Sequence, residues 1–436
     1  MQFLFCQYLF TFEDTAIQKY TSMKNILFLF LLTSFVFSCN QPNNKIEQDT
    51  ELSDEQLQAL ATKIAEEVII TDGHIDVPYR LRHFYNEGEP MPDLSQRTEE
   101  GDFDYVRAKE GGLNAPFMSV YIPARYQKTG GAKELADSLI NSVIDITNSF
   151  PDKYALANTP AEVEKNFETG KISLPMGMEN GAPIGDDLDN VNYFHERGIR
   201  YITLTHSKDN LICDSSYDTT RTWNGLSEFG KQVVQRMNEV GVMIDVSHIS
   251  DSTFYQVMEL STAPVIASHS SCRNFTPGFE RNMSDDMIKL LGEKGGVIQI
   301  NFGSSFLDGD VVNLNKANRV KLDSLLKSNN LTRADSSAAA IIEEFTLQNP
   351  KHYSTVEKVA DHIDHVVHLA GVDHVGIGSD YDGVGDSLPT GLKDVSQYPN
   401  LIYELLKRGY SREEIEKICH KNVWRVWNEV ANTASM

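Results

Sequence analysis

The segment Phe229–His248 reads FGKQVVQRMNEVGVMIDVSH and decides the fold class of this chain. Its first part, Phe229–Val240, repeats apolar residues at helical intervals. An apolar run of strand length follows at Val242–Val246, and His248 comes two residues later. A helix that leads into a buried strand ending at a reactive side chain is the repeating unit of a parallel α/β protein.

The same unit recurs along the chain. The sequence predicts eight strands, at Val68–Thr71, Phe117–Ile122, Ile172–Met178, Tyr201–Thr205, Val242–Val246, Pro264–Ala267, Val297–Asn301 and His374–Gly378. Helical periodicity fills most intervals, as in Met287–Lys294 and Val356–Ala370. Eight alternating units predict an α/β fold of the TIM (β/α)8 barrel type. A doubly wound open sheet is the alternative, but it calls for a glycine-rich turn after the first strand, and Thr71-Asp72-Gly73-His74 is not one.

Polar residues that suit metal binding follow the predicted strands. The catalytic groups of a parallel barrel sit at the C-terminal ends of its strands. In chain order these positions hold His74 with Asp76, then Glu179, His206, His248, His269, Asn301 and Asp380. Imidazole and carboxylate together form the ligand set of zinc or a similar divalent cation.

The spacing of these residues favours two cations rather than one. His74 and Asp76 are two residues apart, which places both side chains on one side of a strand. Glu179 ends a buried strand, where a carboxylate is costly unless positive partners neutralise it. A carboxylate with two oxygens can bridge two ions about 3.5–4 Å apart, and His248 and His269 can complete the second ion.

At this point the chain resembles the renal, or membrane, dipeptidase family of zinc peptidases, which is related in fold to the amidohydrolases. The likeness covers about Ile69 to Val426. It rests on the ordered motifs DGHID (72–76), GMENG (177–181), LTHS (204–207), DVSH (245–248), SHS (268–270) and GSDYDG (378–383). The amidohydrolase relatives usually open with His-x-His, whereas this chain has His-x-Asp, as the dipeptidases do.

The resemblance implies a role for each of these positions. His74 and Asp76 would hold one Zn²⁺, His248 and His269 a second, and Glu179 would bridge the two, with a hydroxide shared between the ions as nucleophile. By the same resemblance Asp380 is the proton carrier and His206 donates to the developing oxyanion. The cofactor expectation is therefore two Zn²⁺ per chain.

The resemblance also implies the substrate. A dipeptide is expected, with tolerance of a D-residue at its second position, and Arg281 best matches the arginine that binds the free carboxylate. Arg273 is the rival candidate for that role. Two other functions remain as alternatives: a related amidohydrolase acting on a lactone or cyclic amide, and a surface lipoprotein that binds without catalysis.

The composition and the absent motifs exclude other classes of function. The 436 residues carry a formal net charge of -23, which disfavours nucleic acid or an anionic membrane surface as the main partner. Neither the His-Glu-x-x-His of single-zinc proteases nor the Gly-x-Ser-x-Gly of serine hydrolases occurs, and a Walker loop is also absent.

The N-terminus has the pattern of a bacterial lipoprotein. Residues 23–38 read as a signal peptide, with Lys24 followed by an apolar run too short to span a membrane. Cys39 after Ser38 resembles a lipidation site, so we expect a protein of the cell envelope, anchored by lipid at the outer membrane or the periplasmic face. Residues 1–22 would then be an upstream extension beyond the natural start, and residues 39–52 a tether.

The remaining chain, 53–436, is predicted to be one barrel domain. Ser53 with Gln56, and Ser411 with Glu414, have capping-box spacing at helix starts. Residues 304–353 form a polar, partly helical insertion that is either a lid over the site or a solvated surface insertion. The family often forms dimers, but no surface pattern here predicts a homodimer.

Overall fold

The computed structural model describes residues 52–434 and confirms the barrel. The predicted extension, the signal peptide, Cys39 and the tether up to residue 51 lie outside the described residues. The eight barrel strands are β1 (Ile70–Ile75), β2 (Leu113–Tyr121), β5 (Met176–Glu179), β6 (Ile199–Thr203), β7 (Met243–Asp245), β8 (Ile266–Ser270), β9 (Val297–Ile300) and β10 (Val375–Ile377). All pair in parallel, and the sheet closes through β1 and β10.

Helices surround the strands, as the alternating pattern predicted. They are α1 (Asp54–Glu67), α2 (Val77–Glu87), α3 (Tyr105–Gly111), α4 (Tyr126–Thr129), α5 (Ala132–Ser149), α6 (Pro160–Glu168), α7 (Asp189–Glu196), α8 (Glu228–Val240), α9 (Asp251–Leu260), α10 (Asp285–Glu293), α11 (Ser304–Leu307), α12 (Gly309–Ser328), α13 (Ala339–Gln348), α14 (Val356–Ala370), α15 (Tyr398–Lys407), α16 (Arg412–Glu416) and α17 (Asn422–Thr433). Both predicted capping boxes are confirmed, at Ser53 on α1 and Ser411 on α16.

All eight predicted strands differ from the observed ones by at least one residue at an end, and two of these differences have a clear cause. The first strand begins at Ile70 and runs to Ile75, because Val68 is the C-terminal cap of α1 and because Asp72 and His74 are fully buried although they are polar. The third run is divided at Pro175, which has no N–H to give to a ladder. The part before the proline is β4 (Ile172–Leu174), which pairs with β3 (Tyr154–Leu156) outside the barrel.

The last helix, α17, covers the end of the barrel where the strands begin. The polar residues lie at the other end. Trp424 and Trp427 on α17 are buried in one apolar cluster with the first residues of several strands and with Phe117. The Phe117 and Trp427 ring centroids are 5.0 Å apart. This packing leaves only the C-terminal ends of the strands open for a site.

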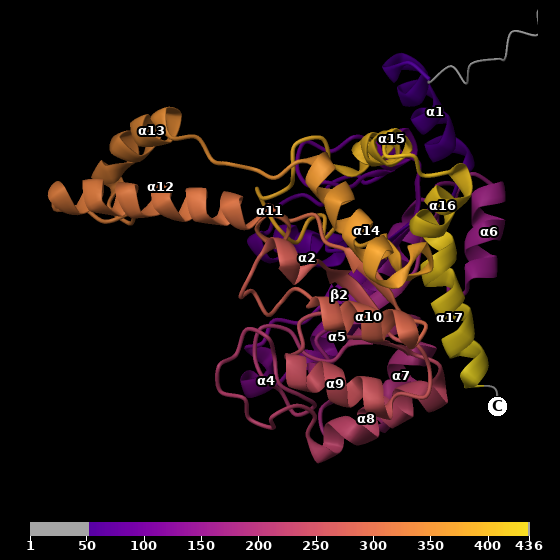
Figure 1. The fold of residues 1–436 in the computed structure, drawn as a ribbon. Coiled ribbons are helices and arrows are strands. Elements are labelled where there is room, and N and C mark those ends of the chain that lie inside the picture. The colour runs from indigo at the N-terminus through magenta and orange to yellow at the C-terminus, as the bar shows by residue number, and fades with distance from the viewer. Residues whose placement is uncertain (1–51, 435–436) are drawn as a thin grey trace, which may run out of the picture. The chain divides into compact units, whose positions relative to one another are not determined.

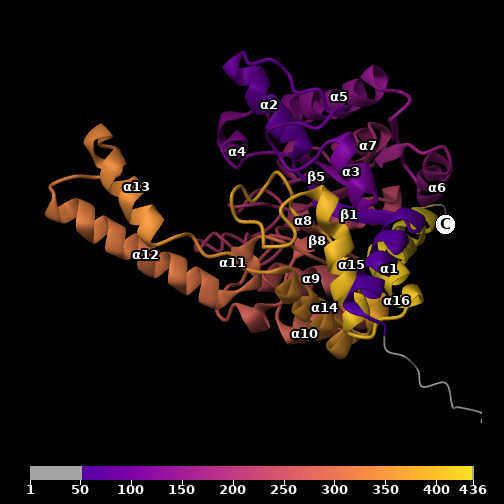
Figure 2. The ribbon, with the colours of Figure 1, turned by 90° about the horizontal axis from the view of Figure 1, so that it is seen from above.

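The predicted insertion is helical and extends away from the barrel (Figures 1 and 2). α12 and α13 pack against each other around a small apolar cluster of their own, with Leu322, Leu326 and Ala338 buried. Only the start of the insertion, at Ser305 and Phe306, lines the cavity at the open end of the barrel. Among residues 52–434, no helix has both the length and the hydropathy that crossing a membrane requires.

Candidate metal centre

The polar residues that follow the strands converge on one point at the open end of the barrel. His74 and Glu179 end their strands, His269 lies within β8, and Asp76 is the N-terminal cap of α2. His206, His248 and Asp380 lie in the loops after β6, β7 and β10. The structure therefore brings together all seven residues that the strand-end pattern selected for metal binding or proton transfer.

Glu179 is the centre of this group. Its Oε1 lies 3.0 Å from His248 Nε2, 3.3 Å from His269 Nε2 and 3.6 Å from His206 Nε2. Its Oε2 lies 3.5 Å from His74 Nε2. One oxygen of the carboxylate thus faces three histidines and the other faces His74, which is the arrangement that a bridging ligand needs.

Ligand atoms gather into three overlapping groups, each compact enough for one cation. They are His74 with Glu179 and His269, Glu179 with His206 and His248, and His74 with Asp76 and Asp380. These sets indicate a site for two metal ions. The geometry alone also permits His206 as a ligand, although its side chain is 20% exposed and those of the other histidines are 6% exposed or less.

Unpaired buried atoms show that the group fits a cation. His74 Nε2 and Asp76 Oδ1 are buried and have no hydrogen-bond partner within residues 52–434. A buried polar atom left unpaired costs roughly 1–3 kcal/mol. A divalent cation coordinated by these atoms would remove that penalty.

Neighbouring side chains hold two of the histidine rings so that Nε2 faces the centre. Tyr201 Oη lies 2.8 Å from His74 Nδ1, and Ser268 Oγ lies 2.7 Å from His269 Nδ1. Ser268 in turn donates to Asp245 Oδ2 at 2.7 Å. Metal-binding histidines commonly use their second nitrogen in this way. Sequence reasoning missed these supporting residues, although Ser268 and Asp245 stand inside the motifs it used.

The two central carboxyl groups differ in their affinity for protons. Burial raises the pKa of Glu179, but His74, His206 and the other histidines outweigh it and hold that pKa well below its usual range. Burial raises the pKa of Asp380 well above its usual range, and Asp76 and Glu179 add to this while His74 opposes it. Of the two carboxyl groups, Asp380 is thus the one with the greater affinity for a proton.

Burial also lowers the pKa of His248 and of His269 well below the usual range. The charge of Arg281 lowers the pKa of both histidines further. A neutral imidazole is the form that binds a metal ion. Both histidines are therefore held in their ligand form.

Three loop residues at the site adopt left-handed backbone conformations although none is glycine. The φ angles are 82° at Asn180, 69° at His248 and 64° at Asp380. Such conformations are unfavourable for residues with a Cβ and cluster at functional sites. They could not be anticipated from the sequence, which shows no glycine at these turns.

A cavity of about 610 Å³ opens in front of the centre. Asp76, Glu179, His206, His248 and Asp380 line it, and three tyrosines, Tyr79, Tyr121 and Tyr217, form part of its wall. The tyrosines were not predicted. Two of them have a signal in the sequence. Tyr121 is the last residue of β2, and Tyr79 lies three residues after Asp76, in the first turn of α2.

Arg281 lies beside the centre but is almost fully buried, at 3% exposure. It donates from Nη1 to Ser270 Oγ and from Nη2 to the His269 carbonyl, both at 2.7 Å. Its Nε has no hydrogen-bond partner among the described residues. The rival, Arg273, is committed elsewhere, because it forms two hydrogen bonds of 2.6 and 2.7 Å with the carboxylate of Asp251.

Comparison with known proteins identifies relatives over nearly the whole described chain. A model of the membrane dipeptidase family, peptidase family M19, matches residues 58–436. Dipeptidase verJ from Clonostachys rogersoniana is 33% identical over 383 residues, which cover 85% of this chain and 86% of the relative. Dipeptidase aclJ from Aspergillus oryzae is 33% identical over 375 residues, covering 84% and 79% of the two chains.

Solved structures show the same likeness. The probable dipeptidase PvdM from Pseudomonas aeruginosa matches with a TM-score of 0.74 and 29% identity, covering 87% of this chain and all of its own. A metallopeptidase from Rhodobacter sphaeroides matches with a TM-score of 0.67 and 25% identity, covering 83% and 99% of the two chains. The latter was solved with a phosphinate mimic of the dipeptide L-Ala-D-Ala.

Proposed function

The chain belongs to the membrane dipeptidase family, and from this premise we propose that its open barrel end hydrolyses dipeptides with two zinc ions. Its activity is that of a metallo-dipeptidase. We therefore set aside both alternatives, the amidohydrolase acting on a lactone or cyclic amide and the surface lipoprotein that binds without catalysis. The observation that carries the finer proposal is the position of Glu179, whose two oxygens face different histidines at 3.0–3.5 Å.

We assign the metal ligands from the sequence motifs and the geometry together. His74 and Asp76 would hold one ion, His248 and His269 the other, and Glu179 both. Nitrogen and carboxylate ligands in compact sets favour zinc over magnesium or calcium, which prefer oxygen alone. When bound, such a pair of ions lowers the pKa of a water molecule towards neutrality and polarises the carbonyl of the scissile bond.

The remaining chemistry falls to Asp380 and His206. Asp380 accepts a hydrogen bond of 2.7 Å from Asn301 Nδ2 and faces the cavity beside Asp76, so it is placed to take a proton from water and give it to the leaving amine. His206 lines the same cavity, with its Nε2 3.6 Å from Glu179 Oε1. Its imidazole is therefore placed to orient the substrate and to stabilise negative charge on the carbonyl oxygen.

The experiment that tests this proposal is metal analysis combined with a substrate panel. The purified protein, reconstituted with zinc, is expected to hold two ions per chain and to cleave dipeptides but not longer peptides. The panel includes dipeptides with a D-residue at the second position, because the Rhodobacter relative bound a mimic of L-Ala-D-Ala. Fewer than two ions together with no turnover of any dipeptide would refute the proposal.

Arg281 is proposed to bind the free carboxylate of the substrate. Arg281→Met should lower kcat/KM for dipeptides by about 10- to 100-fold, the value of one charged hydrogen bond. Cleavage of the same dipeptides with an amidated C-terminus should change much less. Steady-state kinetics on both series measure this, and Arg273→Met serves as the control, since any loss there should affect both series alike. Equal losses in both series for Arg281→Met would contradict the assignment.

We also propose that the mature protein is a lipoprotein of the cell envelope, attached through Cys39. The support is the signal-like segment 23–38 and the small residue Ser38 before the cysteine. Cells fed labelled fatty acid should incorporate label into the wild-type protein and none into Cys39→Ser. Label that persists in the variant would place the lipid at another residue, and absence of label in the wild type would contradict lipidation.

A further inference from the structure

The loop after β10 carries Asp380 in an unusual backbone conformation. Asp380 and Asp382 both have positive φ angles, of 64° and 65°, with one residue between them. The loop is tied to the ligand segment by hydrogen bonds from Asp380 N to the His74 carbonyl at 3.0 Å and from Asp76 N to the Tyr381 carbonyl at 2.8 Å. A loop in this conformation persists only where its surroundings hold it.

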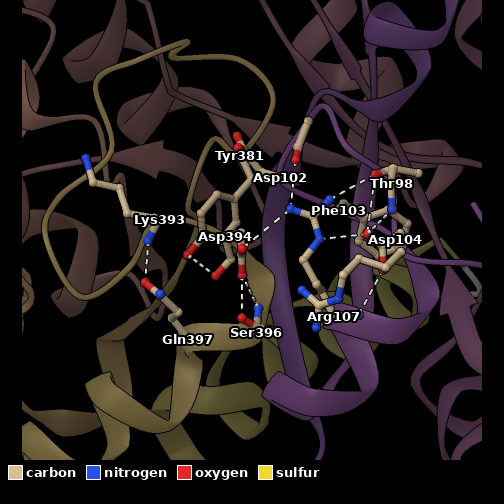
Figure 3. Close-up of polar contacts among 12 residues, drawn as sticks. Thr98, Asp102, Phe103, Asp104, Arg107, Tyr381, Lys393, Asp394, Ser396 and Gln397 are labelled. Atoms are coloured by element: carbon tan, nitrogen blue, oxygen red, sulfur yellow. Dashed lines mark hydrogen bonds and ion pairs between the residues drawn. The ribbon is translucent and has the colours of Figure 1, made fainter. Parts of the chain in front are cut away.

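A distant segment, residues 98–107, supplies that support. Asp102 N donates to Asp382 Oδ1 at 2.7 Å, and Asp382 N donates back to Asp102 Oδ2 at 2.8 Å. Figure 3 shows the same segment, in violet, facing residues 381–397, in yellow. There Arg107 Nη1 approaches Asp394 Oδ2 at 3.4 Å and Tyr381 Oη donates to the Asp394 carbonyl at 3.0 Å.

Arg80 joins this segment to the loop. Its Nη1 donates to the Glu100 carbonyl at 2.8 Å and its Nη2 to the Phe103 carbonyl at 3.0 Å. Its Nε lies 3.3 Å from Asp382 Oδ2, and the Asp382 side chain is only 1% exposed. Arg80 is thus a cation beside the carboxylates of Asp382 and Asp102, with Arg107 the other cation that acts on Asp102. Removal of Arg80 would leave the charge of Asp382 without the cation that pairs with it.

Arg80 also stands one helical turn after a proposed ligand. Its backbone N donates to the Asp76 carbonyl at 3.1 Å at the start of α2. On the other side, a Cβ added at Gly383 would lie 2.2 Å from Asp76 Oδ2 and 2.3 Å from Asp380 Oδ1. The loop therefore touches both acidic groups, and a small shift of it moves Asp380 relative to Asp76.

We propose that Arg80 is a positioning residue, which acts through Asp382 and Asp102 to hold Asp380 in place for proton transfer. The inference rests on the role of Asp380 in the proposed function. Arg80 itself does not line the cavity and touches no reacting group. Its contribution is to fix the loop, because a misplacement of about 1 Å at a catalytic group can cost about 10²-fold in rate.

The test replaces Arg80 and follows turnover, substrate affinity and metal content separately. Arg80→Met should lower kcat for a dipeptide by about 10- to 100-fold, with KM within about threefold of the wild type and two zinc ions retained. The kcat of Arg80→Lys should lie between those of the wild type and of Arg80→Met. An ammonium group keeps the charge but cannot reproduce the guanidinium group that reaches two carbonyls and a carboxylate. The matched control is Arg82→Met, on the same helix but at the groove between α2 and α5, which should behave as wild type.

A crystal structure of Arg80→Met without metal gives a readout independent of activity. The loop after β10 should be displaced, and the 2.7 Å hydrogen bond between Asn301 and Asp380 should be lost. If Arg80→Met does not fold, Arg80→Lys decides. A kcat within threefold of wild type, a loss of activity that appears in KM rather than in kcat, or a loss of kcat accompanied by loss of zinc would overturn the inference. Absence of dipeptidase activity in the wild type would instead refute the proposed function.

Discussion

Replacing Glu179 by glutamine is expected to abolish the two-ion centre and to lower kcat/KM for dipeptides by at least about 10³-fold, which corresponds to about 4 kcal/mol. The reason is geometric. Glu179 is the residue whose two oxygens face separate sets of histidines. Glutamine has the same shape but keeps one acceptor oxygen and replaces the other by a donor, which cannot bind a cation. Metal analysis after zinc reconstitution should find fewer than two ions per chain.

Thermal unfolding gives a second measure of the same effect. A ligand that binds only the folded state stabilises it by about 2.7 kcal/mol when present at 100 times its Kd. The wild type should gain stability on addition of zinc, and Glu179→Gln should gain much less. Glu404→Gln is the matched control, because Glu404 is also a buried glutamate but lies on α15 and pairs with Arg408 rather than with a residue of the centre. Two ions and full stabilisation in Glu179→Gln would exclude a bridging role.

The fold was predictable because burial in a barrel leaves a simple mark on the sequence. Strands that are covered on both faces appear as short apolar runs, and amphipathic helices keep a helical period of apolar residues. The alternation of the two patterns predicted the barrel. The helix Val356–Ala370 has the predicted bounds. The errors arose where tertiary structure overrides hydropathy. The polar residues Asp72 and His74 are part of β1 because distant partners in the fold, Tyr398 and Tyr201, pair with their buried side chains. Pro175 divides an apolar run into two strands that pair with different partners.

The convergence of the histidines and carboxylates that follow the strands was also predictable, since each comes near the end of an apolar run. What the sequence could not show is how they are held. The left-handed turn at Asp380 has no glycine to announce it. The contact of Asp102 with Asp382 spans 280 residues, and that of Tyr201 with His74 spans 127. Such pairs are set by the closure of the barrel, so they become visible only when the strands are placed side by side.

Replacing Asp380 by asparagine is expected to stop turnover while leaving the fold and the metal centre intact. Asparagine tolerates the left-handed conformation that the backbone has here, with φ of 64°. Its side-chain oxygen can still accept the hydrogen bond from Asn301, now 2.7 Å long. What it cannot do is carry a proton, and loss of a general acid–base group lowers kcat by about 10²- to 10⁴-fold.

Three measurements on Asp380→Asn separate proton transfer from binding. The variant should hold two zinc ions, bind a phosphinate mimic of a dipeptide with an affinity close to that of the wild type, and show the loss almost entirely in kcat. Asp386→Asn is the control on the same loop, because Asp386 is exposed and pairs with Tyr353 and Lys351 outside the cavity. If Asp380→Asn instead loses an ion, Asp380 acts as a ligand to the cation held by His74 and Asp76, a role that the compact grouping of these three residues also permits. The proton would then have to be carried by another group, and His206 is the remaining titratable side chain among those proposed to meet the substrate.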